Sequence, residues 1–332
     1  MRGGGIFYMS ILTIIHLDRA TIGPNIQLNR PQCAHRWTSY EATEADDVVE
    51  RLRDADIAIL NKIALNAEQI AQLPKLKMVA ISATGFDKID IAACKAAGIT
   101  LSNIRGYATQ TVPEHTFALI LALRRALKGY EADLSKGAWQ ASGQFCFFNH
   151  SISDIHGKRL GLIGGGSIGG NVARIAEAFG MQVLRAGRKN AEHVPDGYVP
   201  FDEMLATADI ISLHCPLTPA TKDLIAAPEF AQMARKPLII NTARGGLVNE
   251  ADLITALDTG QISGAGFDVL TSEPPADDHI LMQNLHRPNL IVTPHIGWAS
   301  DEAMQVLWDQ LVGHIDAFAA GAPRHDLTAE MG

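Results

Sequence analysis

Several features that mark other protein classes are missing from this sequence. Only four cysteines occur in 332 residues, and no two of them are spaced as a C-x-x-C pair: Cys33, Cys94, Cys146 and Cys215. Such isolated thiols argue against a disulfide framework or a cysteine-based zinc site, and they are typical of a reducing compartment. No apolar run approaches the roughly 20 residues of a membrane span. The longest such run, 117–123, fits a buried helix.

Positive charge is also scarce. The 28 lysines and arginines face 36 aspartates and glutamates, which gives a formal net charge of −8. This balance argues against a nucleic-acid surface. We therefore expect a cytoplasmic globular protein with no metal and with no membrane or nucleic-acid partner. Residues 1–8 are interpreted as an extension ahead of a natural start at Met9, because the alternative, a signal peptide, lacks a small-residue cleavage site.

The sequence does contain a sustained alternation of strands and helices. At this length two domains are expected. From residue 159 onward, apolar runs alternate with helical stretches such as 201–206 and 250–259, which predicts a parallel sheet covered on both faces. The predicted strands of this domain are 159–163, 181–186, 209–214, 237–241, 264–269 and 290–293.

The N-terminal third shows the same alternation but has no glycine-rich motif. Its predicted strands are 11–17, 56–60, 76–82 and 99–102, and its predicted helices are 44–53, 67–72 and 91–97. Two long helices, 112–132 and 300–320, flank the other domain. The segment from Thr111 to Glu114 predicts a capping box, with proline in the first turn, at the start of the first of them.

These elements predict an α/β fold with two doubly wound parallel-sheet domains. One is a Rossmann cofactor domain and the other is a flavodoxin-like substrate domain, with a cleft between them. We expect a substrate-binding segment at 10–108, a dinucleotide-binding domain at 109–297, and a C-terminal segment, 298–332, that returns to the first domain.

The most informative motif is G-x-G-x-x-G, placed between a predicted strand and an amphipathic run. Gly164 allows a sharp turn off the strand, and Gly166 leaves room for a pyrophosphate beside the backbone. Gly169 allows the helix to pack close to the sheet. The helix start at Ser167 and Ile168 offers unpaired N–H groups and a positive dipole to phosphates. This context predicts a dinucleotide site.

Polar residues that follow the later strands give the second signal, because ligands bind beyond the carboxyl ends of parallel strands. Arg244, Glu273 and His295 are expected at one edge of the sheet. A guanidinium can bind a carboxylate and polarise the neighbouring carbonyl. An imidazole can donate a proton to the carbonyl oxygen, and a carboxylate beside it favours its charged form. The set suits reduction of a 2-oxo acid, with His214 as the alternative proton donor.

We expect the cofactor to contact further residues along the same edge. Besides the glycine loop, Arg188 and His295, the predicted contacts are His214, Cys215, Pro216, Thr221, Thr242, Ala243, Asp268 and Gly297. At the end of the second strand, where NAD enzymes place an acidic residue, stand Gly187 and Arg188. The missing carboxylate and the guanidinium favour a 2′-phosphate, so NADP(H) is the preferred cofactor and NAD(H) is the alternative.

These segments resemble the D-isomer-specific 2-hydroxyacid dehydrogenases over about residues 11–320. The residues that carry the likeness are 241–245 (NTARG), 267–269 with Glu273 and Pro274, and 294–297 (PHIG). The resemblance implies that Arg244 binds and polarises the substrate, that His295 is the acid/base, and that Glu273 pairs with it.

Other parts of the chain extend this resemblance. Residues 83–87 resemble the family's substrate loop, which implies that Thr84 and Gly85 bind substrate together with Arg244 and His295. Asn61 and Lys62 resemble a neighbouring active-site turn. The stretch 144–148 resembles the glycerate dehydrogenase branch, which includes hydroxypyruvate and glyoxylate reductases. The family also implies a homodimer built through the cofactor domain.

We therefore expect an oxidoreductase that reduces hydroxypyruvate or glyoxylate. Two alternatives remain open at this point. One is a dinucleotide-sensing regulator or scaffold on the same fold, and the other is a dehydrogenase for a 2-oxo acid of different size.

Overall fold

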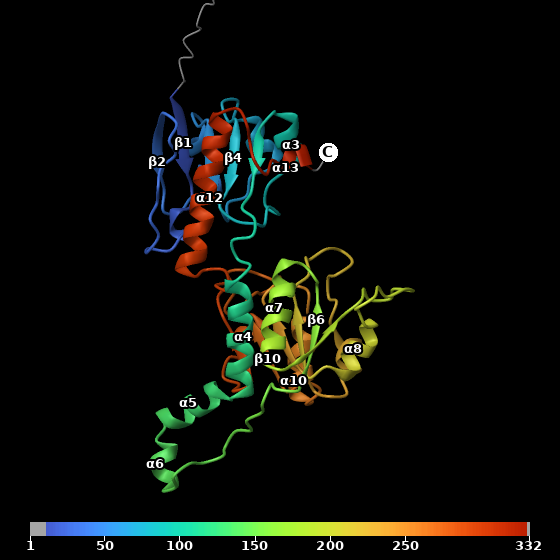
Figure 1. Cartoon of the computed structure of the whole chain (residues 1–332). Coiled ribbons are helices and arrows are strands. Elements are labelled where there is room, and N and C mark those ends of the chain that lie inside the picture. The colour runs from blue at the N-terminus through green and yellow to red at the C-terminus, as the bar shows by residue number, and fades with distance from the viewer. Residues whose placement is uncertain (1–10, 331–332) are drawn as a thin grey trace, which may run out of the picture. The chain divides into compact units, whose positions relative to one another are not determined.

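A computed structural model describes residues 11–330 (Figure 1). The interpretation of residues 1–8 and Met9 lies outside this range, as do residues 10, 331 and 332 of the predicted domains. The chain separates into two compact units. Unit one ends at Tyr107 and resumes at Ala299, and unit two comprises Ala108–Trp298. The expected boundaries differ from these by one residue each.

Unit one contains a five-stranded parallel sheet in the order β2-β1-β3-β4-β5, the flavodoxin-like order. Its strands are β1 (Leu12–His16), β2 (His35–Ser39), β3 (Ile57–Leu60), β4 (Met78–Ile81) and β5 (Thr100–Ser102). The sequence did not predict β2. This strand lies at the sheet edge, pairs with β1, and has no fully buried residue, so it carries no apolar run.

The helices of unit one come from both ends of the chain. They are α1 (Val48–Leu52), α2 (Ala67–Ala71), α3 (Ile91–Ala96), α12 (Asp301–Ala319) and α13 (Leu327–Glu330), with short 3₁₀ helices at Arg19–Thr21 and Ala45–Asp47. The Ser300 hydroxyl caps α12 by accepting a hydrogen bond from Ala303 N at 3.2 Å. Because α12 packs on β4, the C-terminal segment returns to unit one, as the sequence predicted.

Unit two contains a six-stranded parallel sheet in the order β7-β6-β8-β9-β10-β11. Its strands are β6 (Arg159–Ile163), β7 (Gln182–Arg185), β8 (Ile210–Leu213), β9 (Leu238–Asn241), β10 (Gly264–Phe267) and β11 (Leu290–Val292). All six predicted strands are confirmed, each to within two residues at either end. The strand order reverses between β6 and β8, which is where such sheets bind ligands.

Alternate residues of these strands pack into two separate cores. In β9, Leu238 and Ile240 belong to the core beneath α4 and α7, whereas Ile239 belongs to the core on the other face. Helices therefore cover both faces, as the continuous apolar strands predicted. The helices of this unit are α4 (Thr111–Arg124), α5 (Leu127–Ser135), α6 (Ala138–Ser142), α7 (Ser167–Ala178), α8 (Phe201–Thr207), α9 (Ala227–Phe230), α10 (Glu250–Asp258) and α11 (Ile280–Gln283).

The long helix predicted at 112–132 is wrong, because the chain forms two helices there. The break follows α4, where Ala126 adopts a left-handed φ of 53°. The returning chain occupies the end of α4, since Ser153 N donates to the Arg124 carbonyl at 2.9 Å. The predicted capping box is also wrong. Gln110 is the N-cap, and the Thr111 hydroxyl instead donates to Gly297 O at 3.2 Å.

Beyond this break, α5 and α6 form an arm that stands away from the sheet of unit two (Figure 1). A long returning segment connects the arm to β6. Within the described residues, no helix combines the length and the apolar character that a bilayer span requires.

Candidate active site

The glycine motif forms the turn between β6 and α7. Gly164 has a φ of 103°, and a Cβ there would lie 2.5 Å from the carbonyl carbon and oxygen of His214. A Cβ on Gly169 would lie 2.1 Å from the Gly164 oxygen. Glycine at 169 therefore lets the first turn of α7 pack against the glycine loop, whereas the sequence predicted close packing on the sheet. A Cβ on Gly166 would meet no atom within 4 Å. Open space therefore lies beside the backbone where a pyrophosphate is expected.

The start of α7 adds hydrogen-bond donors to this space. Gly166 is the N-cap, and the first hydrogen bond at the helix start runs from Gly170 N to Gly166 O at 2.8 Å. The N–H groups of Ser167, Ile168 and Gly169 precede it and have no helical acceptor. These residues fit a dinucleotide phosphate, because unpaired N–H groups and the helix dipole both favour an anion.

His214, the alternative proton donor, follows β8 beside the glycine loop. Its Nε2 lies 2.8 Å from the Ser212 hydroxyl, and its Nδ1 is buried without a hydrogen-bond partner among the described residues. Burial lowers the pKa of His214 to about 4, so the ring is neutral near pH 7. A neutral imidazole with no carboxylate beside it is a poor acid, which favours His295.

His295 and Glu273 form a direct pair. The His295 Nδ1 lies 2.6 Å from Glu273 Oε2, and both side chains are partly exposed. The other carboxylate oxygen of Glu273 accepts a hydrogen bond from Leu270 N at 2.9 Å. His295 itself has a left-handed φ of 55°. A non-glycine residue rarely adopts this conformation, and such residues cluster at functional sites.

Asp268 holds the loop that carries His295. Its carboxylate is 3% exposed and accepts hydrogen bonds from the Thr293 hydroxyl at 2.6 Å, from Ile296 N at 2.9 Å and from Gly297 N at 2.8 Å. Burial alone would raise the pKa of Asp268, but hydrogen bonds from His115, Thr293, Gly297 and Ile296 lower it. Asp268 is therefore ionised near pH 7 and fixes the backbone on both sides of Ile296.

His115 on α4 completes this network. Its Nε2 lies 2.9 Å from the Thr293 hydroxyl and 3.4 Å from Asp268 Oδ1. Because Thr293 donates its only hydroxyl proton to Asp268, Nε2 of His115 must donate to the Thr293 oxygen. The sequence did not predict this role, since a histidine inside an apolar helix resembles an ordinary core position.

Arg244 follows β9 in the same sheet. Its Nη1 donates to Ala243 O at 2.8 Å, and its own carbonyl accepts from Asn241 Nδ2 at 2.8 Å. A Cβ on Gly245 would lie 1.8 Å from Leu270 O, so this turn packs closely on the loop that leads to Glu273. The strand ends therefore bring the Arg244 turn and the Glu273 loop together. Binding of substrate by Arg244 stays a prediction.

Arg188 and Lys189 differ in their surroundings. Arg188 is exposed and forms no ion pair with another residue in 11–330. The Lys189 Nζ lies 2.7 Å from Oε1 of Glu229, which is 4% exposed, so this lysine is held within the protein. Gly187 is buried, and a Cβ there would lie 3.1 Å from Val194 Cγ1. Of these two cations, Arg188 is therefore the one available to bind a ligand.

Three other predicted cofactor residues use their polar groups within the protein. The Thr221 hydroxyl donates to Pro216 O at 2.7 Å, the Thr242 hydroxyl lies 2.9 Å from that of Thr116, and Ala243 N donates to Asn241 Oδ1 at 3.1 Å. Burial raises the pKa of Cys215, which leaves its thiol protonated near pH 7. These positions stay predictions as cofactor contacts.

The predicted substrate loop lies in unit one, just after β4. The Thr84 hydroxyl donates to Ile104 O at 2.8 Å, and its carbonyl accepts from Asn103 Nδ2 at 2.7 Å. Gly85 follows directly, and substrate binding by this loop stays a prediction. Asp18, which follows β1, was not predicted as part of the site. Its carboxylate accepts from Asn61 N and Lys62 N at 2.9 and 2.7 Å, so the rule that sites lie at strand ends could have found it.

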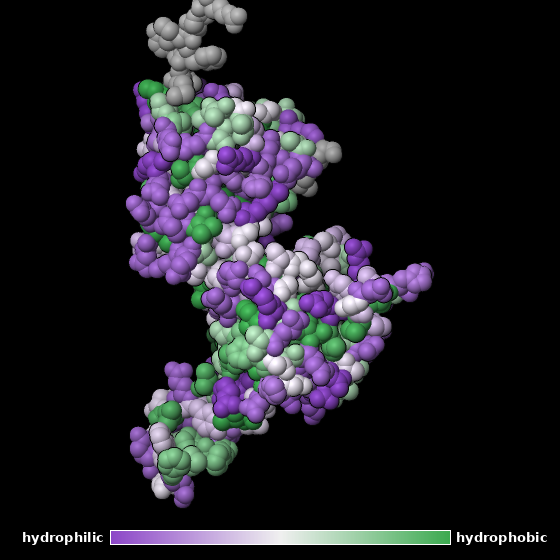
Figure 2. All heavy atoms as spheres, in the orientation of Figure 1, coloured by the Kyte–Doolittle hydropathy of each residue, from purple (hydrophilic) through white to green (hydrophobic). Residues whose placement is uncertain are grey.

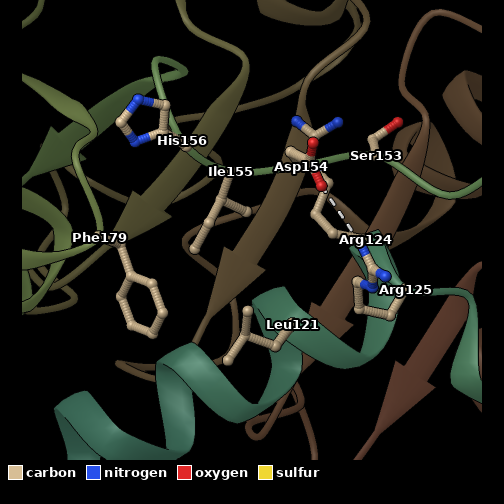
Figure 3. Close-up of a pocket in the computed structure, with 8 residues that line it drawn as sticks. All are labelled: Leu121, Arg124, Arg125, Ser153, Asp154, Ile155, His156 and Phe179. Carbon is tan, nitrogen blue, oxygen red and sulfur yellow. Dashed lines mark hydrogen bonds and ion pairs between the residues drawn. The ribbon is translucent and has the colours of Figure 1, made fainter.

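A pocket of about 260 Å³ lies elsewhere in unit two (Figure 3). Ile155 and His156 line it and lead into β6, so it lies beside the start of that strand, whereas the glycine loop follows its end. Arg125 donates to Asp154 there at 3.2 Å. The pocket contains none of the predicted site residues. In the part of the chain that the structure describes, no group of three or more His, Cys, Asp and Glu side chains is arranged to hold a metal ion.

The family described as D-isomer specific 2-hydroxyacid dehydrogenase, NAD binding domain, matches residues 117–297. Glycerate dehydrogenase from Methylorubrum extorquens is 48% identical over 318 residues, which are 95% of this chain and 99% of that protein. Hydroxypyruvate reductase from Blautia hydrogenotrophica is 35% identical over 284 residues, covering 85% of this chain and 87% of that protein.

A solved structure shows the same fold. D-lactate dehydrogenase from Aquifex aeolicus, complexed with NAD and lactic acid, has a TM-score of 0.77 at 27% identity, and the match covers 93% of this chain and 96% of that chain. This chain therefore belongs to the D-isomer-specific 2-hydroxyacid dehydrogenase family, whose members act on small 2-hydroxy acids with a nicotinamide dinucleotide.

Proposed function

We propose that this protein reduces a small 2-oxo acid, hydroxypyruvate or glyoxylate, to the corresponding 2-hydroxy acid, of D configuration where the carbon is chiral. The observation that carries the proposal is the 2.6 Å contact between His295 Nδ1 and Glu273 Oε2. It directs Nε2, the other ring nitrogen, toward a substrate. It also places a negative charge where a protonated imidazole needs one.

The chemistry divides between the cofactor and the protein. When bound, a reduced nicotinamide would supply the hydride that the carbonyl carbon gains, and the glycine loop with the N–H groups at the start of α7 would hold its dinucleotide. Arg244 binds the substrate carboxylate and polarises the carbonyl, and His295 donates the proton from Nε2 to the carbonyl oxygen. In the reverse direction neutral His295 accepts the proton of the hydroxyl. Asp268 keeps the His295 loop in place throughout.

The substrate class is supported by the relatives. The names of two of them, glycerate dehydrogenase and hydroxypyruvate reductase, describe the two directions of one such reaction. We infer that hydroxypyruvate and glyoxylate are the acids that this chain accepts. Equal or higher rates with bulky 2-oxo acids in a panel of substrates would overturn that choice.

We also infer a preference for NADPH over NADH. Arg188 is exposed and unpaired in the described chain, and Gly187 places no carboxylate at the position where one would repel a 2′-phosphate. Lys189 contributes less, because Glu229 already neutralises it. NADH remains a possible second cofactor.

A homodimer built through unit two is part of the proposal. The arm and its returning segment expose large apolar side chains, including Phe145 at 93% and Phe148 at 83% (Figure 2). Exposed apolar patches of this kind mark interaction surfaces. We infer that a second copy covers the arm. A Phe145→Ser/Phe148→Ser variant should then sediment as a monomer, with Val306→Ser in unit one as the matched control. A monomeric wild-type protein would contradict the inference.

The four cysteines are all free, which supports a reducing compartment and, by inference, the cytoplasm. The direct test of the proposed function is a rate measurement with NADPH and a panel of 2-oxo acids of increasing size. Hydroxypyruvate and glyoxylate should give the highest kcat/KM. Binding of NADPH with no turnover of any 2-oxo acid would favour a regulator on this fold instead.

A further inference from the structure

Tyr198 reaches the glycine loop from a different part of unit two. It lies at the base of the loop between β7 and α8. Two backbone hydrogen bonds close this base, from Gly187 N to Val199 O at 2.9 Å and from Val199 N to Arg185 O at 2.8 Å. The position of Tyr198 is therefore fixed by the residue that follows it.

The contact is made by the phenol hydroxyl. A Cβ on Gly165 would lie 2.6 Å from Tyr198 Oη but 3.7 Å from Cζ, so the close approach involves the hydroxyl alone. The G-x-G-x-x-G pattern leaves the residue after its first glycine free. In this chain a side chain at position 165 would collide with the Tyr198 hydroxyl, which explains the glycine there.

The Tyr198 hydroxyl can still donate a hydrogen bond. Tyr198 is 37% exposed, and its hydroxyl forms no hydrogen bond with another residue of the described chain. It lies against Gly165, one residue before the N-cap of α7, and the first N–H groups of that helix likewise have no helical acceptor. A hydroxyl donor on the glycine loop and unpaired N–H groups at a helix N-terminus both suit an anion.

We propose that the Tyr198 hydroxyl donates a hydrogen bond to the pyrophosphate of the bound dinucleotide. The proposal rests on the dinucleotide binding of this family and on neither the choice of 2-oxo acid nor the preference for NADPH. Arg188, on the same loop, faces the 2′-phosphate in the proposal above, so Tyr198 and Arg188 contact different parts of the cofactor.

The test is the Kd of NADPH and of NADH for Tyr198→Phe, measured by the fluorescence of the reduced nicotinamide. The variant keeps the ring and its packing. Because both cofactors contain the pyrophosphate, we expect both Kd values to rise about tenfold, the effect of losing one hydrogen bond to a charged group. Unchanged Kd values would overturn the proposal. A rise for NADPH alone would overturn it too, because Tyr198 would then contact the 2′-phosphate.

A second substitution tests the geometry. Gly165→Ala displaces the hydroxyl and should weaken binding of both cofactors in the wild-type background. In the Tyr198→Phe background the added methyl meets only ring carbon at ordinary contact distance. The double variant should therefore bind both cofactors as Tyr198→Phe does. If the two effects multiply instead, the two residues act independently and the proposal is overturned. Failure of 2-oxo acid turnover would leave these binding results unaffected.

Discussion

Oε2 of Glu273 lies 2.6 Å from Nδ1 of His295, and its Oε1 accepts the N–H of Leu270. Each carboxylate oxygen thus has its own partner. One orients the imidazole, and the other anchors the carboxylate to its own loop. The pair therefore leaves Nε2 as the ring nitrogen for the proposed proton transfer.

Glu273→Gln should separate orientation from charge. The amide can still bond to the ring, but it no longer stabilises a protonated imidazole. We expect kcat/KM for 2-oxo acid reduction to fall at least tenfold, because the neutral amide offers no charge to the imidazolium that donates the proton. Steady-state kinetics with glyoxylate check this. A wild-type kcat/KM in the variant would show that the carboxylate charge plays no part.

Arg244→Ala should lower kcat/KM by more than the roughly 10²-fold expected for one transition-state donor, because the same guanidinium also holds the substrate carboxylate. Arg244→Lys is the matched control. It keeps the charge but not the two-pronged geometry, and it should recover only part of the loss. Steady-state kinetics with glyoxylate test both variants. Full activity in the lysine variant would contradict the bidentate role.

Thr293→Val should act through the position of His295. The change removes the hydroxyl that links His115 to Asp268 and leaves the side-chain volume nearly unchanged. We expect kcat to fall about tenfold, in proportion to one buried hydrogen bond. Thr293→Ser should restore the wild-type value. The pH–rate profile should keep its position, because Glu273 still pairs with His295, and a shifted profile would contradict a positioning role.

Arg188→Ala should weaken NADPH binding by at least tenfold and leave NADH binding within about twofold, because only NADPH carries the 2′-phosphate. Lys189→Ala is the matched control, since Glu229 already holds that cation. Gly187→Asp combined with Arg188→Ala should move the preference toward NADH. The added side chain requires Val194, 3.1 Å from the new Cβ, to move by a few tenths of an ångström. Fluorescence titrations with both cofactors measure the ratio, and equal affinities in the wild type would contradict the assignment.

The stability of unit one should fall in mild acid. His16 is fully buried between Trp37 and Trp308, and burial, with lesser effects from Arg19 and Arg30, lowers its pKa to about 4. The unfolded chain therefore takes up the proton first as pH falls below about 6.5, which favours unfolding. Between pH 7 and 5 the loss is on the order of 2 kcal/mol. His16→Phe should remove this contribution in urea titrations, whereas His314 on α12, whose pKa burial also lowers to about 4, keeps its own. An unchanged pH dependence in the variant would contradict this account.

The four inner strands of unit two, β6, β8, β9 and β10, were predictable because they are almost fully buried and read as apolar runs. The break after Arg124 was not, because it depends on the returning chain that binds the Arg124 carbonyl. The edge strand β2 was missed for a related reason, since its polar residues form a strand only by pairing with β1.

In the candidate site, too, some residues were predictable from local motifs and others were not. Glycine spacing and strand ends pointed to Gly164, Gly166, Glu273 and His295. The supporting contacts could not be predicted, because His115 meets Asp268 only through the packing of α4 on the sheet. Local motifs identify groups that react, whereas long-range packing determines what holds them.

The most direct test of the central claim compares wild-type protein with His295→Ala by following oxidation of NADPH with hydroxypyruvate. The wild type should turn over steadily, and the variant should lose turnover while it still binds NADPH. Near-normal rates in His295→Ala would contradict the account.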